Sequence, residues 1–577
     1  MDRESGKLYS DPLYGTKILS PLAVEIIDTA EFQRLNEMRQ LGLSDTTYRG
    51  ARHSRFEHSV GTYFLVRSIL RRIEQNHERM GFAHPGCLVS KSFRHVPANA
   101  NAPMEWVSPH SCWRGVTEVV SAAALLHDLS HVPFGHAMED EFAGLYEKHD
   151  GLANPRLYWM LFHEQSELAD VFSEQRARWI GGLKNEDVCR LIYVILSWKE
   201  DIRNEDNHVD VGFREVLDSE LQKCGTGNRA ERLVALRTWH AAFVEGQLFH
   251  PFMSDAIGDT ICADLLDYIA RDRQHVGMEL RFHSRLQRYF TIRPGSLYPE
   301  EGLRVSIRVG KSESQEQRRD VATAVMDVMR DRYEMIERIY YHHKKAAATC
   351  MAMKLLDLVP RELRPRDDDS LYPAPWSAGY VPTIPHLIHL SDSEIIRYAA
   401  EVEFESSDEA RQVRAGLYAG LRYQRRLVYR TLVVIDYEAV VQHSKFGLNY
   451  IVAEMRQKRV LLEKELAAKA SVRYGDILVF CPTTRMQRKE TNARVEITEG
   501  KILPLARQHA SFACETDLTA LDKYYDELWR AYIFVQPDVY KQVGKCDLIM
   551  RSLCDRLNLP LDIAYQKYRG PKSPLRE

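Results

Sequence analysis

The sequence lacks several features that would place the protein in a specialised class. Its 10 cysteines are scattered and form no Cys-x-x-Cys pair, which argues against a zinc knuckle or a disulfide framework and favours a reducing compartment. No run approaches the roughly 20 consecutive apolar residues that a membrane-spanning helix needs. The polar N-terminus also lacks the apolar segment of a signal peptide. We therefore expect a cytoplasmic protein with no membrane partner.

An excess of charge of one sign is absent as well. The 78 basic residues nearly balance the 81 acidic ones, and the formal net charge is -3. A protein without a strong positive field attracts polyanions weakly, so nucleic acid is not expected as the main partner, although a local basic pocket stays open. The chain has no internal repeat and no extended low-complexity tract. At 577 residues it can bury a large core and form more than one domain.

Helical periodicity dominates the chain. Apolar residues recur at helical spacing along 20–40, 55–74, 116–128, 162–175, 254–275, 320–358, 394–416 and 453–470. Segments 430–437, 474–482 and 493–505 are instead rich in β-branched and aromatic residues, which is typical of strands. Because prolines and three aspartates accumulate in 360–390, we predict a boundary there. The predicted fold is mostly α, with a large helical domain over 1–360 and a smaller mixed α/β lobe over 361–577.

The strongest chemical signal is a histidine followed by an aspartate at the end of an apolar helix. The segment from Val119 to Leu126 delivers His127 and Asp128, and Pro133 and Gly135 then break the chain. A neutral imidazole beside a carboxylate makes a natural pair of ligands for a divalent metal. The dipeptide is common, however, so its significance depends on the context.

Two further segments supply that context. Ser54 and Glu57 have the spacing of a capping box, and Arg55 and His58 then share one face of the helix that follows. Residues 255–277 favour a single long helix with a polar stripe on an otherwise apolar surface. The stripe consists of Asp264, Tyr268, Asp272 and His275. A polar stripe can be a solvated face, but the apolar neighbours favour burial.

These motifs together resemble the HD superfamily. The pattern has Arg-Phe-Glu-His ending at His58, the pair His127-Asp128, and Asp-x-x-Asp-Tyr-x-x-Arg-Asp ending at Asp272. More narrowly, the chain is similar to the deoxynucleoside triphosphate (dNTP) triphosphohydrolases. This closer likeness is carried by segments 26–35 and 39–42 and by the triplet His163-Glu164-Gln165. It is strong over about 10–60, 117–170 and 250–345, and it implies an HD-domain helical core.

The resemblance implies a metal-dependent hydrolase. His58, His127, Asp128 and Asp264 would bind one divalent ion, and the donor set does not distinguish Mn, Fe, Mg, Ni or Zn. The implied reaction converts a dNTP to a deoxynucleoside and inorganic triphosphate, which would limit dNTP pools and could oppose viral replication. Three histidines and a glutamate match catalytic positions. They are His131, His136 as general acid, His163, and Glu139 as the group that orients His136.

The resemblance also assigns the substrate contacts. Arg55, Arg332, Tyr268 and Tyr340 would contact phosphate or sugar. Gln40 and Asp272 would hold the sugar 3′-hydroxyl, and Leu41 would crowd the 2′ carbon and disfavour ribonucleotides. For each of these residues, a structural role as a packed side chain or an ion-pair partner is the alternative.

Some features depart from the family pattern. Leu265 stands where the family has a lysine, which puts affinity for a full triphosphate in question. Asn36 replaces a regulatory arginine, so a nucleotide effector stays open, and longer insertions occupy 79–115 and 195–250. Relatives assemble, so a homo-oligomer is expected. Two other functions remain open: a phosphodiesterase or nuclease acting on cyclic nucleotides, oligonucleotides or single strands, and a nucleotide sensor without turnover.

Overall fold

The structure is a computed structural model of the chain. It describes residues 6–89, 108–141, 149, 151, 154–173, 179–180, 183–197, 229–258, 261–281, 284–296, 302–311, 316–360, 390–422, 428–484, 493–498, 500–507 and 509–561.

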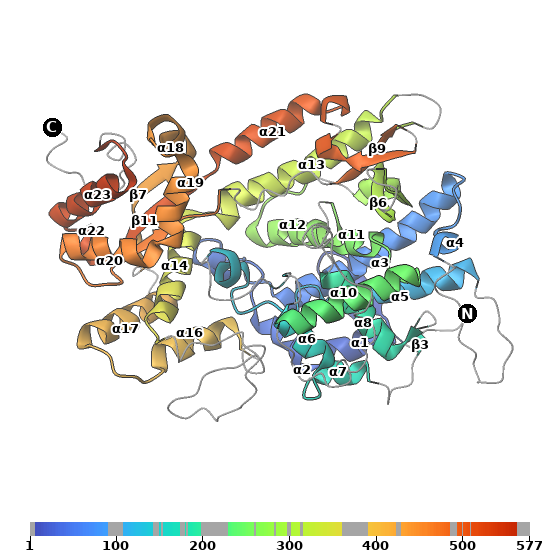
Figure 1. Cartoon of the computed structure of the whole chain (residues 1–577), viewed down its shortest axis with the longest axis horizontal. Helices are drawn as coiled ribbons and strands as arrows, with labels where there is room; N and C mark the ends of the chain where they lie inside the picture. Colours follow the sequence, from blue (N-terminus) through green and yellow to red (C-terminus); the bar gives the residue numbers. More distant parts are fainter. Residues whose placement is uncertain are drawn as a thin grey trace.

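Three helices meet at the centre of the N-terminal part: α3 (Arg55–Arg79), α5 (Pro109–Leu126) and α12 (Ala263–Val276). Helix α3 begins at the predicted capping box, since Ser54 Oγ accepts from the Glu57 amide and the Glu57 carboxylate accepts from the Ser54 amide. The capping box fixes the first turn of α3, where Arg55 and His58 lie. Figure 1 shows α3 and α5 side by side, with α12 crossing them.

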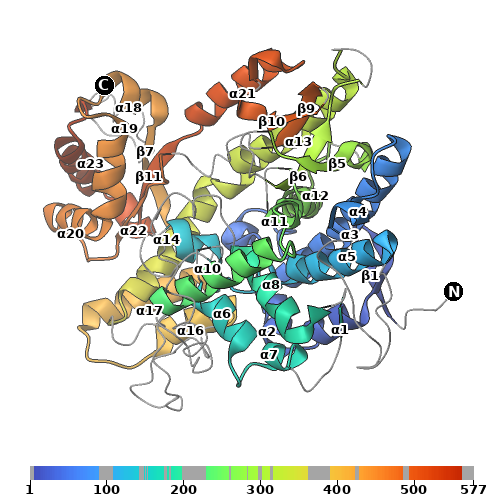
Figure 2. The ribbon, with the colours of Figure 1, turned by 45° about the vertical axis from the view of Figure 1, so that its right-hand side comes forward.

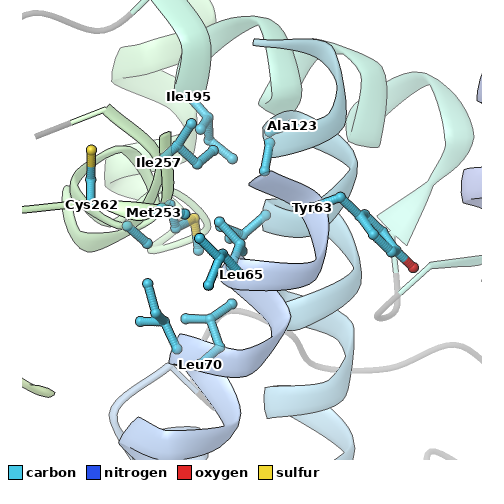
Figure 3. Close-up of a cluster of buried hydrophobic side chains, with 14 of the residues drawn as sticks. Tyr63, Leu65, Leu70, Ala123, Ile195, Met253, Ile257 and Cys262 are labelled. Carbon is cyan, nitrogen blue, oxygen red and sulfur yellow. The ribbon is translucent and has the colours of Figure 1, made fainter. Parts of the chain in front are cut away.

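A continuous apolar core supports these helices. Figure 3 shows part of it: side chains of α3 and α5 interlock with those of α8 (Asn185–Ser197) and α11 (Phe252–Gly258). The labelled members from these four helices are Tyr63, Leu65, Leu70, Ala123, Ile195, Met253 and Ile257, all buried. Close packing of this kind leaves few voids into which side chains could shift, so the three helices hold their relative positions rigidly.

The remaining elements of this part surround that core. The helices are α1 (Pro21–Ile27), α2 (Ala30–Gln33), α4 (Pro85–Val89), α6 (Pro155–Phe162), α7 (Glu167–Val171), α10 (Arg229–Glu245), α13 (Arg319–Met335) and α14 (His343–Asp357). Two small antiparallel pairs join them: β1 (Lys7–Asp11) with β2 (Gly15–Leu19), and β3 (Trp179–Ile180) with β4 (Leu183–Lys184).

The strands predicted near the C-terminus are confirmed, but they belong to two sheets. Strands β7 (Arg430–Asp436) and β8 (Ile477–Phe480) flank β11 (Arg530–Val535) in a three-stranded sheet. Strands β9 (Arg494–Thr498) and β10 (Lys501–Pro504) instead join β5 (Phe290–Pro294) and β6 (Leu303–Arg308), in the order β10-β9-β6-β5. Ile307 of β6 pairs with Val495 of β9 in parallel register. The C-terminal part of the chain therefore returns to complete a sheet of the N-terminal part.

Helices cover the three-stranded sheet. They are α18 (Tyr437–His443), α19 (Gly447–Val452), α20 (Arg459–Ala470), α22 (Pro537–Tyr540) and α23 (Val543–Leu557), while α16 (Asp392–Glu401) and α17 (Asp408–Arg422) pack on α14. Helix α21 (Glu515–Glu527) runs along α13 and links β10 to β11 (Figures 1 and 2). The mostly α fold with a smaller mixed lobe is confirmed. Across the described ranges, no helix is both long and apolar enough to traverse a membrane.

Several predicted helices are interrupted. Residues 255–277 form two helices, α11 and α12, because Cys262 is extended (φ -132°) and caps α12. Residues 320–358 form α13 and α14 separated by a π-helical turn at Ile336–Tyr340. The helices predicted over 20–40, 162–175, 394–416 and 453–470 are likewise split or shortened by turns. The breaks matter because the first one places Asp264 in the first turn of α12.

Three segments that the sequence singles out lie largely outside the described residues. They are the boundary at 361–389 and the centres of the two insertions at 90–107 and 198–228. The division into domains at residue 360 therefore stays a prediction.

Candidate metal centre and active-site pocket

The four predicted metal ligands come together from three helices. His58 lies in the first turn of α3, His127 and Asp128 follow the last turn of α5, and Asp264 lies in the first turn of α12. His58 Nε2 lies 3.2 Å from His127 Nε2 and 3.2 Å from Asp264 Oδ1. Asp128 completes the group, with Oδ1 at 3.4 Å from His127 Nε2 and Oδ2 at 3.8 Å from His58 Nε2.

These spacings fit a divalent metal. Two donors that each bind one ion at about 2.1 Å lie roughly 3.0–3.5 Å apart in octahedral or tetrahedral geometry. His58, His127 and Asp264 form one of the groups of potential ligands whose donor atoms lie within 4.8 Å of one another. The cluster is therefore compatible with a divalent metal, and mixed imidazole and carboxylate donors suit several elements.

Hydrogen bonds on the far side of each ring aim its Nε2 into the cluster. His58 Nδ1 donates to Asp267 Oδ2 at 2.8 Å, and His127 Nδ1 donates to the Ala124 carbonyl at 2.8 Å. Asp267 is itself held by Arg271 Nε at 2.9 Å and by the Tyr14 hydroxyl at 2.7 Å. Such partners fix the tautomer and raise the basicity of a ligating imidazole. Sequence reasoning quoted Asp267 in the motif but gave it no role.

The carboxylates strongly affect the ionisation of the cluster. Burial alone would lower the pKa of His58, but hydrogen bonds to Asp264 and Asp267 raise it to about 10. For Asp128, burial opposes ionisation, but His127, His131 and Arg55 outweigh it and hold the pKa well below its ordinary value. The cluster thus attracts positive charge, whether a proton or a metal ion.

A cavity of about 440 Å³ opens over three of these ligands, His127, Asp128 and Asp264. All seven predicted substrate residues line it: Gln40, Leu41, Arg55, Tyr268, Asp272, Arg332 and Tyr340. Asp272 is oriented by His53 Nε2 and by the Tyr340 hydroxyl, each at 2.7 Å. The buried Gln40 Oε1 has no hydrogen-bond partner among the described residues, so it can accept from a ligand.

Positive charge lines the same cavity. Arg55 Nη1 donates to Asp128 Oδ2 at 2.5 Å. Arg55 is therefore an ion-pair partner of Asp128, which was the alternative to its role as a phosphate contact. Arg332 Nε donates to the Tyr268 hydroxyl at 3.0 Å. Lys345 of α14, which sequence reasoning missed, lines the cavity, and its Nζ donates to the Tyr340 carbonyl at 3.1 Å. The buried Leu265 stands where the resemblance would supply a lysine, but Lys345 provides a cation on the cavity wall.

The predicted catalytic histidines do not all lie together. His136 lines the cavity, and the buried His131 lies behind it, with ring centroids 4.9 Å apart. His163 is outside the cavity lining: it follows the end of α6 in extended conformation and stacks on Trp159 at 4.8 Å. Its predicted role beside the scissile bond stays a prediction.

His149 lies on the cavity where a third histidine was expected. Its ring stacks on His131 at 3.5 Å. The two oxygens of Glu139 accept from His131 Nδ1 (3.0 Å) and His149 Nδ1 (2.9 Å), so Glu139 orients these two rings, and its predicted role toward His136 stays a prediction. No motif or periodicity around His149 gave a signal in the sequence.

Comparison with known proteins finds relatives that are named as HD domain-containing proteins or as deoxynucleoside triphosphate triphosphohydrolases. An HD domain-containing protein of Acanthamoeba polyphaga mimivirus is 32% identical over 138 residues, which is 24% of this chain and 26% of the relative. The deoxynucleoside triphosphate triphosphohydrolase SAMHD1 of Xenopus laevis is 34% identical over 139 residues (24% of this chain, 17% of the relative), and that of Homo sapiens 32% over 162 residues (28% and 20%). The resemblance to HD-domain triphosphohydrolases is confirmed.

The likeness is regional. The matched part spans only about a quarter or less of the length of the curated relatives, and no family model matches the chain. The likeness and the clustered histidines and carboxylates both point to HD-domain proteins.

Proposed function

We propose that this chain is a metal-dependent dNTP triphosphohydrolase. One observation carries the proposal: three of the four metal ligands, two potential sugar ligands and three cationic side chains all face one cavity of about 440 Å³. The relatives named deoxynucleoside triphosphate triphosphohydrolase support the substrate class. Water attacks the α-phosphorus, the bond to the 5′-oxygen breaks, and inorganic triphosphate and a deoxynucleoside leave.

The residues around the cavity divide the substrate between them. Arg55, Arg332 and Lys345 neutralise the triphosphate, and the fork of each arginine suits phosphate oxygens. Gln40 and Asp272 hold the 3′-hydroxyl, with the unpaired Gln40 Oε1 as acceptor. Leu41, on the same wall, crowds the 2′ position and excludes ribose.

The chemistry at phosphorus requires an activated water and a proton donor. His58, His127, Asp128 and Asp264 would hold a divalent metal, which would supply Lewis-acid activation of the phosphate and of water. His136, on the cavity wall, donates a proton to the departing 5′-oxygen. The rings of His131 and His149, held by Glu139, support it from behind.

Product analysis tests this proposal. The purified chain is incubated with each dNTP and rNTP in Mn²⁺ or Mg²⁺, and the products are separated by ion chromatography. We expect inorganic triphosphate from dNTPs only, at least 100-fold less from Asp264→Asn, and an unchanged rate from His443→Gln, which alters a histidine at the end of α18 outside the cavity lining. Asp264 is preferred to Asp128 because removing Asp128 would leave Arg55 buried without its carboxylate.

Two results would contradict the assignment. Release of triphosphate from rNTPs as fast as from dNTPs would remove the role of Leu41. Failure to release triphosphate from any nucleotide, with metal bound and with nucleotide mixtures as effectors, would favour a phosphodiesterase or nuclease at the same cluster. A homo-oligomer and a nucleotide effector remain part of the proposal. Light scattering with and without dNTP mixtures tests both.

A further inference from the structure

A buried carboxylate from the C-terminal part of the chain reaches two loops of the cavity. Asp392 is the first residue of α16 and is only 6% exposed. Its Oδ2 accepts from the Arg39 amide at 3.0 Å, and its Oδ1 accepts from the Phe134 amide at 2.7 Å. These two amides belong to segments that are far apart in the sequence. One side chain therefore fixes the position of one loop relative to the other.

The first loop carries two of the proposed sugar contacts. Gln40 and Leu41 follow Arg39 directly, and both line the cavity. A second backbone contact comes from the segment that precedes α3, where the His53 carbonyl accepts from the Gln40 amide at 3.0 Å. The backbone from which the Gln40 and Leu41 side chains project is thus held by α16 as well as by that segment.

The second loop carries His136 and has a strained backbone. Phe134 has a positive φ of +62°, a conformation that costs free energy for a residue with a side chain, and Gly135 follows with a φ of +49°. Such a turn persists only where its surroundings hold it, and the bond to Asp392 acts at the strained residue itself. His136, the proposed proton donor, comes two residues later and lines the cavity. Asp392 therefore supports the loop that delivers the proton donor.

The helix that carries Asp392 does not use this carboxylate for its own capping. Ser391 Oγ accepts from the Glu394 amide at 3.2 Å, and the Glu394 carboxylate accepts from the Ser391 amide at 2.8 Å. Both oxygens of Asp392 are thus left to serve other segments. Burial raises the pKa of Asp392, and the amides of Arg39 and Phe134 oppose that rise. The two loop contacts are therefore what makes the buried carboxylate tolerable.

We propose that Asp392 is a positioning residue for the reaction, which sets the loop of Gln40 and Leu41 against the loop of His136. Asp392 lies behind both loops and is not among the residues of the cavity wall, so it acts through them. The inference rests on the proposed function and gives the C-terminal part of the chain a role in it. Sugar preference and proton donation should both depend on this one side chain.

The alternative is a purely structural role, in which Asp392 only anchors α16. Apolar side chains of this helix already provide an anchor, since Ile395 and Ile396 share a buried cluster with Phe134. The two roles differ in what changes when the carboxylate is removed. An anchor predicts a loss of stability alone, whereas a positioning residue predicts altered sugar preference in molecules that remain folded.

Two variants of neighbouring residues separate these roles in the full chain. Asp392→Asn keeps the size of the side chain, but its amide group can accept from only one of the two backbone amides. Ser391→Ala weakens the start of the same helix and leaves the carboxylate and its two bonds in place. Thermal melting compares their stabilities, and steady-state kinetics with a dNTP and the matching rNTP compare their activities. Hydrogen exchange at single-residue resolution follows the amides of Arg39 and Phe134.

We expect the Arg39 or the Phe134 amide of Asp392→Asn to exchange at least tenfold faster than in the unaltered protein. The same variant should lower kcat/KM for the dNTP at least tenfold and narrow the preference for dNTP over rNTP at least fivefold. Ser391→Ala should lower the melting temperature to a similar extent and change each of the other quantities less than threefold.

Three results would overturn the inference. They are an unchanged sugar preference in Asp392→Asn, an equal change of preference in Ser391→Ala, and rapid exchange of both amides in the unaltered protein. The last measurement decides even if Asp392→Asn does not fold. Hydrolysis of dNTP with normal sugar preference in Asp392→Asn leaves the proposed function in place. If the unaltered chain releases no triphosphate while both amides are protected, the proposed function fails and the contacts of Asp392 with the two loops are upheld.

Discussion

At the scale of single residues, the centre depends on two buried aspartates and on the histidines and arginines that face them. Asp128 faces His127, His131 and Arg55 at once, and Asp267 joins His58 to Arg271. These carboxylates are buried, so each is stable only because a cation or an N–H group faces it. Arg55 pairs with Asp128, so the loop that follows His127 and Asp128 must leave room for the Arg55 guanidinium.

Gly135 provides that room. It has a positive φ of +49°, and a Cβ there would overlap the Arg55 guanidinium and lie 3.3 Å from His131 Nδ1. We expect Gly135→Ala to lower the free energy of unfolding by about 1–3 kcal/mol and to reduce hydrolysis at least tenfold, as measured by urea denaturation and product release. Gly544→Ala is the control: nothing lies within 4 Å of its Cβ position in α23, so it should be neutral or slightly stabilising. Equal stability of the two variants would contradict the role of Gly135.

The raised pKa of His58 predicts how the metal-free protein responds to pH. The pKa is about 10 in the folded state against an ordinary value of 6.5 for histidine, so the proton on His58 stabilises the fold. That stabilisation is complete below about pH 6.5 and is lost as pH rises towards 10, with a slope of about 1.4 kcal/mol per pH unit.

Chemical denaturation of chelator-treated protein between pH 6 and 10 measures this slope. The loss of stability with rising pH should be smaller in His58→Gln, and added metal should remove it from the unaltered protein because the metal takes the place of the proton. A pH profile that is the same in the presence and absence of metal would show that His58 is not the titrating group.

At the scale of elements, helix ends position the ligands. His58 and Asp264 lie in first turns, and His127 and Asp128 follow a last turn, so three helix ends converge. The capping box of α3 fixes one of these ends directly. The break between α11 and α12 fixes another, because Cys262 starts α12 two residues before Asp264.

Removal of the α3 cap should affect both stability and metal binding. Ser54→Ala should lower the free energy of unfolding by about 1 kcal/mol and weaken Mn²⁺ binding several-fold, since the turn carrying Arg55 and His58 loosens. Isothermal calorimetry measures the affinity. Ser108→Ala removes the cap of α5, whose other end carries His127. It should cost similar stability and leave the affinity unchanged; an equal loss of affinity in both variants would exclude a local effect.

At the scale of the whole molecule, the two predicted lobes are interleaved. Several residues that follow residue 360 belong to the same buried core as α3 and α5: Val495, Ile497, Leu505, Phe512 and Leu518. The Asp392 carboxylate accepts from the amides of Arg39 at 3.0 Å and Phe134 at 2.7 Å, so α16 holds two loops of the cavity. The C-terminal part thus contributes to the core and to the site.

A fragment of residues 1–360 should consequently fail to fold on its own. Without β9 and the core residues that follow it, β6 has an unpaired edge and its apolar face is exposed. We expect no cooperative thermal transition by circular dichroism, and recovery when residues 361–577 are co-expressed. A cooperative melt of the isolated fragment would show instead that the boundary at 360 separates independent domains.

The sequence alone predicted the mostly α fold, the C-terminal strands, the capping box and the convergence of His58, His127, Asp128 and Asp264. These features rest on local periodicity, on capping and on closely spaced motifs, which a linear pattern records. Only the tertiary structure decided the partners of the C-terminal strands, the place of His149 on the cavity, the contacts of Asp267 and the presence of Lys345. Each depends on contacts between segments far apart in the chain, for which local spacing carries no signal.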